Sequence, residues 1–350
     1  MKKILPPRLQ KGDKVGIAAP AGPITEKQLA TAISRVEKAG YIAVPAEGIT
    51  DRLGYLAGSD EGRARQINAL FADKSIKALL AARGGFGCTR ILDKIDYELI
   101  KQNPKIIGGY SDLTALICAI NKKTGLVTFH SSMLVPEETE YSKISMWNLF
   151  ENGTKNYRIT CEETRKQKKD ISSQEPTVLK SGKCRGTLFG GNLTLLESLL
   201  DTEYDFNLNN KILFLEEINE PPYKVDRMLT HLRNAGKLKG VKGIIFGILK
   251  GCEAQGNESL SLDYVINDFI QDLRIPIVKN FTFGHVISRC TFPIGVKARL
   301  NTEDMTVTLL ENCVESDDSE IYNYQSTHHP DGLEVVDEKE KQEFEKWLNV

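Results

Sequence analysis

Residues 105–120, KIIGGYSDLTALICAI, place a short apolar strand directly before a helix. Gly108 and Gly109 end the apolar run and permit a sharp backbone turn, and Ser111 opens the helical stretch. A strand that passes through such a turn into a helix is the unit from which parallel sheets covered by helices are built. This segment therefore predicts an α/β fold.

The same alternation extends over the first 130 residues. One predicted helix begins at Thr25, its N-cap, and ends at Gly40. Asp60 is available to cap the next predicted helix. Strands are predicted at 14–20, 42–47, 78–83, 105–110 and 125–129, and helices at 25–40, 60–73 and 111–125. Residues 1–140 are therefore predicted to form a domain with a mainly parallel sheet covered on both faces.

The second half is predicted to be a strand-rich α+β domain over residues 181–315. Residues 141–180 are predicted to be a linker, because the polar stretch 162–177 has little that could fill a core. Residues 316–350 are a tail, with an amphipathic helix expected at 339–350. Strands are predicted at 186–191, 211–217, 242–249, 292–300 and 305–310, helices at 192–200, 223–236 and 262–273, and a hairpin turn at 301–304.

Composition excludes several classes of protein. Lys plus Arg number 46 and Asp plus Glu 47, so the net charge of −1 gives no reason to expect nucleic acid or an anionic membrane as partner. The sequence contains no run of about 18 apolar residues that could span a bilayer. Pro6 and Pro7 stand where a signal peptide needs a continuous apolar stretch. The seven cysteines show no C-x-x-C spacing, which predicts a reduced, cytoplasmic protein.

Ser111 is a candidate nucleophile. Gly109-Tyr110-Ser111 matches the first half of the G-x-S-x-G nucleophile elbow, but Leu113 stands where the last glycine would be. The turn would expose the hydroxyl and leave N–H groups at the helix start to stabilise an oxyanion. The alternative is that Ser111 merely caps the helix, as serines before helices usually do.

A glycine-rich loop follows the predicted strand at 78–83. Gly84, Gly85 and Gly87 could hold an anion with their amides. The loop is not followed by Gly-Lys-Ser/Thr and fits a dinucleotide fingerprint poorly, so no cofactor is expected. Cys88 within this loop is interpreted as structural rather than as a thiol nucleophile.

Candidate partners for a serine nucleophile lie at later strand ends. Glu216 and Glu217 end one apolar strand, and His285 follows another in a Gly-His turn. A carboxylate can orient a histidine, and a histidine can act as a base, although both residue types are more often structural at such places. His130, which follows a strand of the first domain, competes with His285 as the base. Without an H-E-x-x-H motif or another cluster at ligand spacing, no metal is expected.

Taken together, these segments resemble the LD-carboxypeptidase family, which includes murein tetrapeptide carboxypeptidases and microcin C immunity peptidases. The resemblance extends to about residue 315 and covers several blocks in the expected order. These blocks are KGDKVGIAAPAGP (11–23), YLAGSDEGRARQINALF (55–71), ARGGFGCTRIL (82–92), IIGGYSDLTAL (106–116), TFHSSML (128–134), GTLFGGNLTLL (186–196), LFLEEINEPPYKVDRML (213–229) and FGHV (283–286).

The resemblance implies a Ser-His-Glu triad of Ser111, His285 and Glu216, with Glu216 preferred over Glu217. It also implies an oxyanion hole formed by the Asp112 amide and one amide of Gly84 or Gly85. The implied fold is a Rossmann-like N-terminal domain with a swivelling C-terminal domain that carries the glutamate and the histidine, usually as a homodimer. Possible contacts for the substrate or its carboxylate, which the sequence does not rank, are Arg83, Asn192, Arg185 and Arg227.

The implied reaction is hydrolysis of the bond to a terminal D-alanine in a murein tetrapeptide, during peptidoglycan recycling in the cytoplasm. Lysine and diaminopimelate both remain open as the third residue of that peptide. One alternative is an immunity-type peptidase that cleaves aminoacyl-nucleotide antibiotics, although Trp147 and Trp347, the two tryptophans, lie outside the matched blocks. The other is a non-catalytic protein that binds an anion at the glycine loop.

Overall fold

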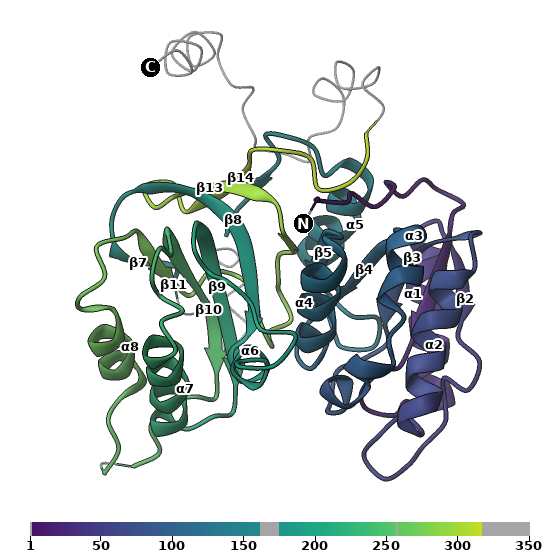
Figure 1. The fold of residues 1–350 in the computed structure, drawn as a ribbon, viewed down its shortest axis with the longest axis horizontal. Helices are drawn as coiled ribbons and strands as arrows, with labels where there is room; N and C mark the ends of the chain where they lie inside the picture. The colour runs from purple at the N-terminus through teal and green to yellow at the C-terminus, as the bar shows by residue number, and fades with distance from the viewer. Residues whose placement is uncertain (1, 162–174, 257, 317–350) are drawn as a thin grey trace, which may run out of the picture. The chain divides into compact units, whose positions relative to one another are not determined.

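A six-stranded sheet forms the first half of the molecule (Figure 1). The computed structural model describes residues 2–161, 175–256 and 258–316. The strand order is β12-β5-β4-β3-β1-β2, with β5 to β2 mutually parallel and β12 antiparallel to β5. The strands are β1 Lys14–Ala18, β2 Ile42–Pro45, β3 Ile76–Ala81, β4 Ile106–Gly109, β5 Thr128–His130 and β12 Phe292–Ile294. The predicted parallel α/β sheet is confirmed.

The three predicted helices of this half are present as α1, α2 and α4, with one difference in capping, whereas η1, α3 and α5 were not predicted. Thr25 caps α1 through a capping box with Gln28, as predicted. The cap of α2 is Ser59 rather than Asp60, because the Ser59 hydroxyl accepts the Gly62 N–H while Asp60 pairs with arginines. The helices are α1 Glu26–Lys38, α2 Asp60–Ala72, η1 Cys88–Lys94, α3 Tyr97–Gln102, α4 Leu113–Thr124 and α5 Glu140–Asn152.

The second half carries an eight-stranded sheet. Its order is β6-β14-β13-β8-β9-β10-β11-β7, with a parallel centre from β8 to β11 and antiparallel edges. The strands are β6 Arg158–Ile159, β7 Thr177–Lys180, β8 Lys183–Asn192, β9 Lys211–Ile218, β10 Gly243–Lys250, β11 Ile277–Lys279, β13 Lys297–Asn301 and β14 Thr306–Leu309, and the helices α6 Leu193–Ser198, α7 Pro222–Asn234 and α8 Leu262–Ile270. The strand-rich second half and the hairpin of β13 and β14 are confirmed.

The strand predicted at 292–300 is wrong as a single strand. It divides into β12, which joins the first sheet, and β13, which joins the second. Gly295 lies between them with φ +93°, a conformation that a residue with a side chain rarely adopts, and this permits the chain to turn from one sheet to the other. A strand from the second half therefore completes the sheet of the first.

The predicted linker over 141–180 contains ordered elements. Helix α5 occupies its start and buries Met146, Leu149 and Phe150, and β6 and β7 follow. Most of the polar stretch at 162–177 and the tail from 317 onward, with its expected helix at 339–350, lie outside the described residues. The exact domain boundaries stay a prediction.

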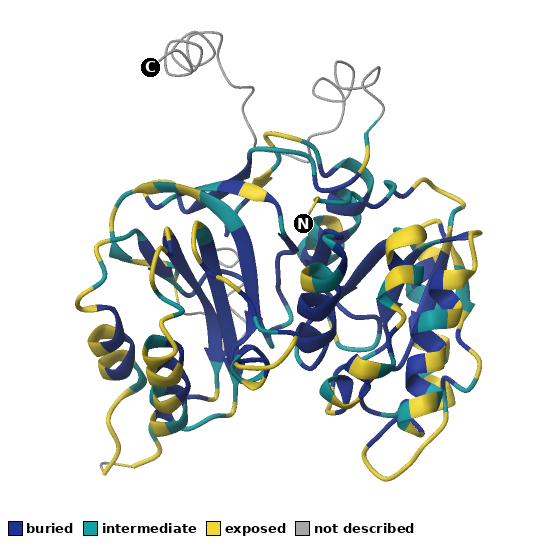
Figure 2. Ribbon diagram, viewed as in Figure 1, coloured by how far each residue is buried: buried dark blue, intermediate teal, exposed yellow. Residues whose placement is uncertain are grey.

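The two sheets meet through aromatic side chains and one helix. Phe292 of β12 stacks on Phe214 of β9 with ring centroids 4.9 Å apart, and Phe283 contacts both rings edge-on. The Thr114 hydroxyl of α4 accepts the Asn192 N–H of β8 at 3.1 Å. Figure 2 shows the central strands of both sheets mainly buried, and the helices with exposed outer faces. None of the helices in the described ranges is long and apolar enough to cross a bilayer.

Candidate active site

Three side chains from distant segments lie in one hydrogen-bonded row. The Oγ of Ser111 is 2.9 Å from Nε2 of His285, and Nδ1 of the same ring is 2.7 Å from Oε2 of Glu216. A carboxylate only accepts hydrogen bonds, so Nδ1 carries the proton and Nε2 presents its lone pair to the serine hydroxyl. The row has the geometry of a nucleophile, a base and an acid that orients the base.

Ser111 adopts a backbone conformation that is uncommon outside glycine. Its φ is +64°, between the end of β4 and the start of α4. A side chain at Gly109 would meet Leu113 at 2.8 Å, so this glycine makes room for the helix to follow directly. The helix cap is Asp112, and its side chain makes no capping hydrogen bond. Ser111 is therefore not a helix cap, and its hydroxyl is directed to His285 instead.

Glu216 is fully buried at the end of β9. Burial by itself would raise its pKa, but the electrostatic interaction and hydrogen bond with His285, together with the nearby ring of His130, outweigh this and lower the pKa to about 2. Glu216 therefore stays ionised and can hold the His285 ring in one orientation. The ring also needs Gly284, whose φ is +115°, because a Cβ there would come within 3.1 Å of the Glu216 carboxylate.

The glycine loop contacts the candidate nucleophile. A Cβ on Gly84 would lie 3.0 Å from Ser111 Oγ, so the missing side chain keeps open the space beside the hydroxyl. The Gly84 carbonyl accepts the Gly22 N–H at 3.3 Å and Arg83 Nε at 3.2 Å. Because the peptide is trans, these two donors also fix the direction of the Gly85 N–H, which points away from that carbonyl.

The second expected oxyanion donor belongs to Asp112. Among the described residues, the N–H groups of Gly85 and Asp112 find no hydrogen-bond acceptor, as expected of donors reserved for a ligand. The Asp112 carboxylate accepts the Cys88 N–H at 2.8 Å and so ties the glycine loop to the turn that carries Ser111. This arrangement can stabilise a negative oxygen that develops next to Ser111.

Comparison with known proteins shows which family has this arrangement. Family models described as the LD-carboxypeptidase N-terminal domain and C-terminal domain match residues 15–131 and 185–300. A probable murein peptide carboxypeptidase of Bacillus subtilis is 39% identical over 310 residues, which cover 87% of this chain and 93% of the relative. The chain belongs to the LD-carboxypeptidase family. It is accordingly a hydrolase, a serine carboxypeptidase.

Solved structures agree with this LD-carboxypeptidase assignment. The crystal structure of an MccF-like protein from Bacillus anthracis is 28% identical with a TM-score of 0.78, over 88% of this chain and 100% of that one. The muramoyltetrapeptide carboxypeptidase from Oxalobacter formigenes is 26% identical with a TM-score of 0.73, over 87% and 100%. The two-domain fold of the LD-carboxypeptidases is thus the fold of this chain.

His130, the competing base, lies on the far side of Glu216. Its Nε2 is 3.9 Å from Glu216 Oε1, and neither ring nitrogen has a hydrogen-bond partner within the described part of the chain. The ring is buried against Tyr110, Phe214 and Phe283. Since the Ser111 hydroxyl already bonds His285, the geometry favours His285 as the base and leaves His130 beside the acid.

Glu217 and Asn192 are occupied in holding a helix. Glu217 accepts hydrogen bonds from Asn192 Nδ2 at 2.9 Å and from the N–H of Thr194 at 2.8 Å. The Asn192 side chain also caps α6 by accepting the Leu195 N–H. These contacts give Asn192 a structural role at the edge of the site, and they turn Glu217 away from His285.

The remaining expected substrate contacts differ in position. Arg83 is half-buried next to the glycine loop, whereas Arg185 and Arg227 are exposed on β8 and α7. Arg185 is seven residues before Asn192 on β8, and Asn192 pairs with Glu216, so Arg185 lies roughly 23 Å from the level of the acid. The structure therefore brings Arg83 to the site and leaves Arg185 remote.

Two further observations concern the chemistry of the LD-carboxypeptidase site. Burial raises the pKa of the Cys88 thiol well above its ordinary value, which agrees with a structural cysteine. In the described ranges, no group of three or more His, Cys, Asp or Glu residues is arranged to hold a metal ion. Sequence reasoning missed Tyr110, whose ring packs edge-on against His285 at 5.0 Å, and no pattern in the sequence signals that contact.

Proposed function

We propose that this enzyme hydrolyses the amide bond between an L-configured centre and the terminal D-alanine of a murein tetrapeptide, with Ser111, His285 and Glu216 as its catalytic triad. The observation that carries the triad is the row of hydrogen bonds of 2.9 and 2.7 Å. Support for the substrate comes from the Bacillus subtilis relative, named as a probable murein peptide carboxypeptidase. We place the reaction in cytoplasmic peptidoglycan recycling by a homodimer.

The first half of the reaction forms an acyl-enzyme. His285 Nε2 takes the hydroxyl proton as Ser111 Oγ attacks the scissile carbonyl carbon. The developing oxyanion accepts hydrogen bonds from the Asp112 N–H and an amide of Gly84 or Gly85, and one such donor is worth about 10²–10³ in rate. His285 then gives its proton to the leaving nitrogen, and D-alanine departs.

The second half restores the enzyme. Water attacks the ester carbon and gives a proton to His285, which passes it to Ser111 Oγ as the acyl group leaves as a carboxylate. In both halves the ionised Glu216 holds the Nδ1 proton and stabilises the positive ring. This reaction uses only side chains, backbone N–H groups and water, so we expect undiminished activity after extensive dialysis against EDTA.

The test is release of D-alanine from a murein tetrapeptide by the purified protein. Ser111→Ala should lower kcat at least about 10³-fold, because the nucleophile is lost while binding is kept. Ser198→Ala, on the exposed face of α6, is the matched control and should leave kcat unchanged. Full turnover by Ser111→Ala would contradict the triad.

Two further substrates separate the proposal from its alternatives. Cleavage of an aminoacyl-nucleotide amide in preference to the tetrapeptide would keep the triad but replace the substrate by that of an immunity-type peptidase. If the wild-type protein binds the tetrapeptide as tightly as Ser111→Ala does and neither protein hydrolyses either compound, the protein is a binder and not the proposed hydrolase.

A further inference from the structure

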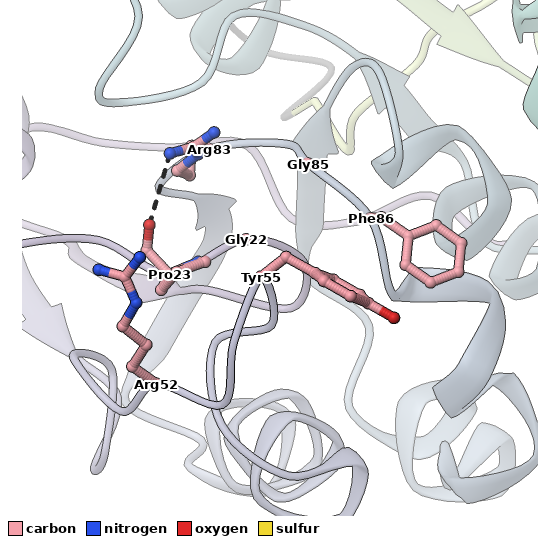
Figure 3. A pocket seen from close by; sticks show the side chains of 7 residues that line it. All are labelled: Gly22, Pro23, Arg52, Tyr55, Arg83, Gly85 and Phe86. Atoms are coloured by element: carbon pink, nitrogen blue, oxygen red, sulfur yellow. Dashed lines mark hydrogen bonds between the residues drawn. The ribbon is translucent and has the colours of Figure 1, made fainter.

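An open pocket lies beside the glycine loop (Figure 3). It has a volume of about 490 Å³, within the range of small-ligand sites. The loop before α2 contributes Arg52 and Tyr55, and the loop after β3 contributes Arg83, Gly85 and Phe86. The triad described above uses none of these side chains.

The pocket lies beside the glycine that contacts the candidate nucleophile. Its lining residues Arg83 and Gly85 flank Gly84, and a Cβ on Gly84 would touch Ser111 Oγ at 3.0 Å. A peptide whose scissile carbonyl sits on Ser111 would therefore lie beside the loop that lines this pocket. This position favours a substrate subsite over an unrelated surface hollow.

The positive charge of the pocket favours binding of an anion. In the described ranges no carboxylate pairs with Arg52 or Arg83. Both donate to backbone carbonyls, Arg52 to that of Gly54 and Arg83 to those of Gly84 and Pro23. Each guanidinium carries five N–H donors, so several remain available on both side chains. Two neighbouring arginines in the same half behave differently, since Arg63 and Arg90 both pair with Asp60.

The other wall of the pocket is aromatic. Tyr55 is 67% exposed and Phe86 48% exposed, and their ring centroids lie 5.9 Å apart. Figure 3 shows the two rings side by side, set apart from the two guanidinium groups. Exposed aromatic rings in the same pocket as arginines that pair with no carboxylate are typical of a surface that binds a partly apolar anion.

We propose that this arginine–aromatic pocket binds a carboxylate of the peptide substrate. Arg52 and Arg83 bind the carboxylate, and Tyr55 and Phe86 cover the aliphatic part next to it. This assignment rests on the proposed function, because it takes the ligand to be a peptide acid. The carboxylate is either the terminal one, next to the scissile bond, or one further along the peptide.

The experiment uses Arg52→Gln, because Arg83 also holds the Gly84 carbonyl and its loss would disturb the oxyanion donors. Kinetics are measured with three tetrapeptides: the free acid, one with an amidated terminus, and one with the carboxylate further along the peptide amidated. Arg274→Gln, an exposed arginine in the second half, is the matched control. We expect Arg52→Gln to raise KM for the free acid about 10- to 100-fold while kcat stays within about twofold.

The amidated peptides identify which carboxylate is bound. The peptide that lacks the relevant carboxylate should have a high KM with the wild-type enzyme and show no further rise with Arg52→Gln. If KM of Arg52→Gln matches that of Arg274→Gln on all three peptides, the subsite is wrong. The subsite assignment is also wrong if Tyr55→Ser and Phe86→Ser change the oligomeric state in analytical ultracentrifugation and leave KM unchanged. The pocket would then be a contact between copies of the chain.

Binding to the inactive Ser111→Ala protein separates this inference from the proposed hydrolysis. If wild-type protein releases no D-alanine but the free acid binds Ser111→Ala in calorimetry and loses at least 10-fold in affinity with Arg52→Gln added, the subsite stands and the proposed reaction falls. If D-alanine is released and neither KM nor affinity depends on Arg52, the reaction stands and the subsite falls.

Discussion

Ser111 combines a reactive position with an unfavourable backbone. A left-handed conformation costs a residue with a Cβ roughly 1–2 kcal/mol, and the φ of +64° at Ser111 places it in that region. This conformation holds the Ser111 hydroxyl 2.9 Å from Nε2 of His285. Stability and activity are therefore opposed at this residue.

Replacing Ser111 by glycine should make this opposition measurable. Ser111→Gly removes both the hydroxyl and the strain, whereas Ser111→Ala removes only the hydroxyl. We expect both variants to be inactive and the glycine variant to be about 1 kcal/mol more stable than the alanine variant. Urea denaturation of the two proteins gives the difference, and a more stable alanine variant would contradict the strain.

Glu216 should make stability depend on pH in the acid range. Its folded pKa of about 2 lies below the ordinary value, so its charge contributes stability above about pH 4.5 that is lost as pH falls through about 2. Glu216→Gln lacks this titration. The free energy of unfolding of wild type minus that of Glu216→Gln should therefore be largest near pH 7 and narrow between pH 5 and 3.

The measurement is chemical denaturation at several pH values. Glu98→Gln, on the surface helix α3, provides the control for loss of a carboxylate elsewhere. A difference between wild type and Glu216→Gln that stays constant from pH 7 to pH 3 would show that Glu216 is not held as a charged group in the folded state.

At the same scale, the sequence could identify the residues of the proposed triad but not choose between neighbouring candidates. Glu216 and Glu217 are adjacent in one strand, so their side chains point to opposite faces and only the packed structure tells which face holds His285. His130 and His285 both follow strands. Only the positions of Ser111 and Glu216 in space show which of the two histidines can act as the base, and a local sequence pattern does not contain these positions.

The elements around the site depend on glycines with positive φ. Gly284 precedes His285 with φ +115°, and a Cβ there would lie 3.0 Å from the Ile248 carbonyl and 3.1 Å from Glu216. Gly236, after α7, also has a positive φ of +69°, but its Cβ would meet nothing within 4 Å. Comparing substitutions at Gly284 and Gly236 therefore distinguishes the effect of backbone strain from that of steric crowding.

Gly284→Ala should therefore be more harmful than Gly236→Ala. Both substitutions carry the strain of a left-handed backbone, but only the first pushes on β10 and on the acid of the triad. We expect a loss of about 1–3 kcal/mol beyond the control, with a fall in kcat that the control lacks. Equal losses in stability and unchanged kcat in both proteins would contradict this account.

Element prediction succeeded where local patterns decide and failed where tertiary contacts decide. Buried apolar runs and the Thr25 cap placed β1, β3, β4 and α1 correctly. Residues 292–300 read as one strand, because the turn at Gly295 serves two sheets that no local pattern reveals. Helix α5 was missed because its hydrophobic residues face the packed core without a strong stripe.

For the whole molecule, the aromatic contact between the sheets is the feature on which the site depends. Ser111 follows β4 of the first sheet and Glu216 lies in β9 of the second, and Phe292 and Phe214 stack across the boundary. Displacing one part of a catalytic row by about 1 Å can cost on the order of 10²-fold in rate. We therefore expect the aromatic cluster to contribute to catalysis by holding the proposed triad in position.

Phe292→Ala tests this dependence. Phe292 is fully buried, so its truncation should cost about 3–5 kcal/mol of stability. Activity measured well below the unfolding temperature should also fall, because the two sheets lose a shared contact. Phe269→Ala, in α8 of the second half, is the control for a buried ring away from the boundary, and an equal loss of kcat in both variants would contradict a role in alignment.

The return of β12 to the first sheet has a consequence for dividing the chain. A fragment that stops near residue 140 would lack the strand that pairs with β5 and would present its unpaired edge to solvent. Such an edge invites β-pairing between copies, so separate expression of the two halves should give aggregation-prone material. By contrast, we expect a variant that keeps residues 292–294 joined to the first half, such as a circular permutant, to stay free of aggregation.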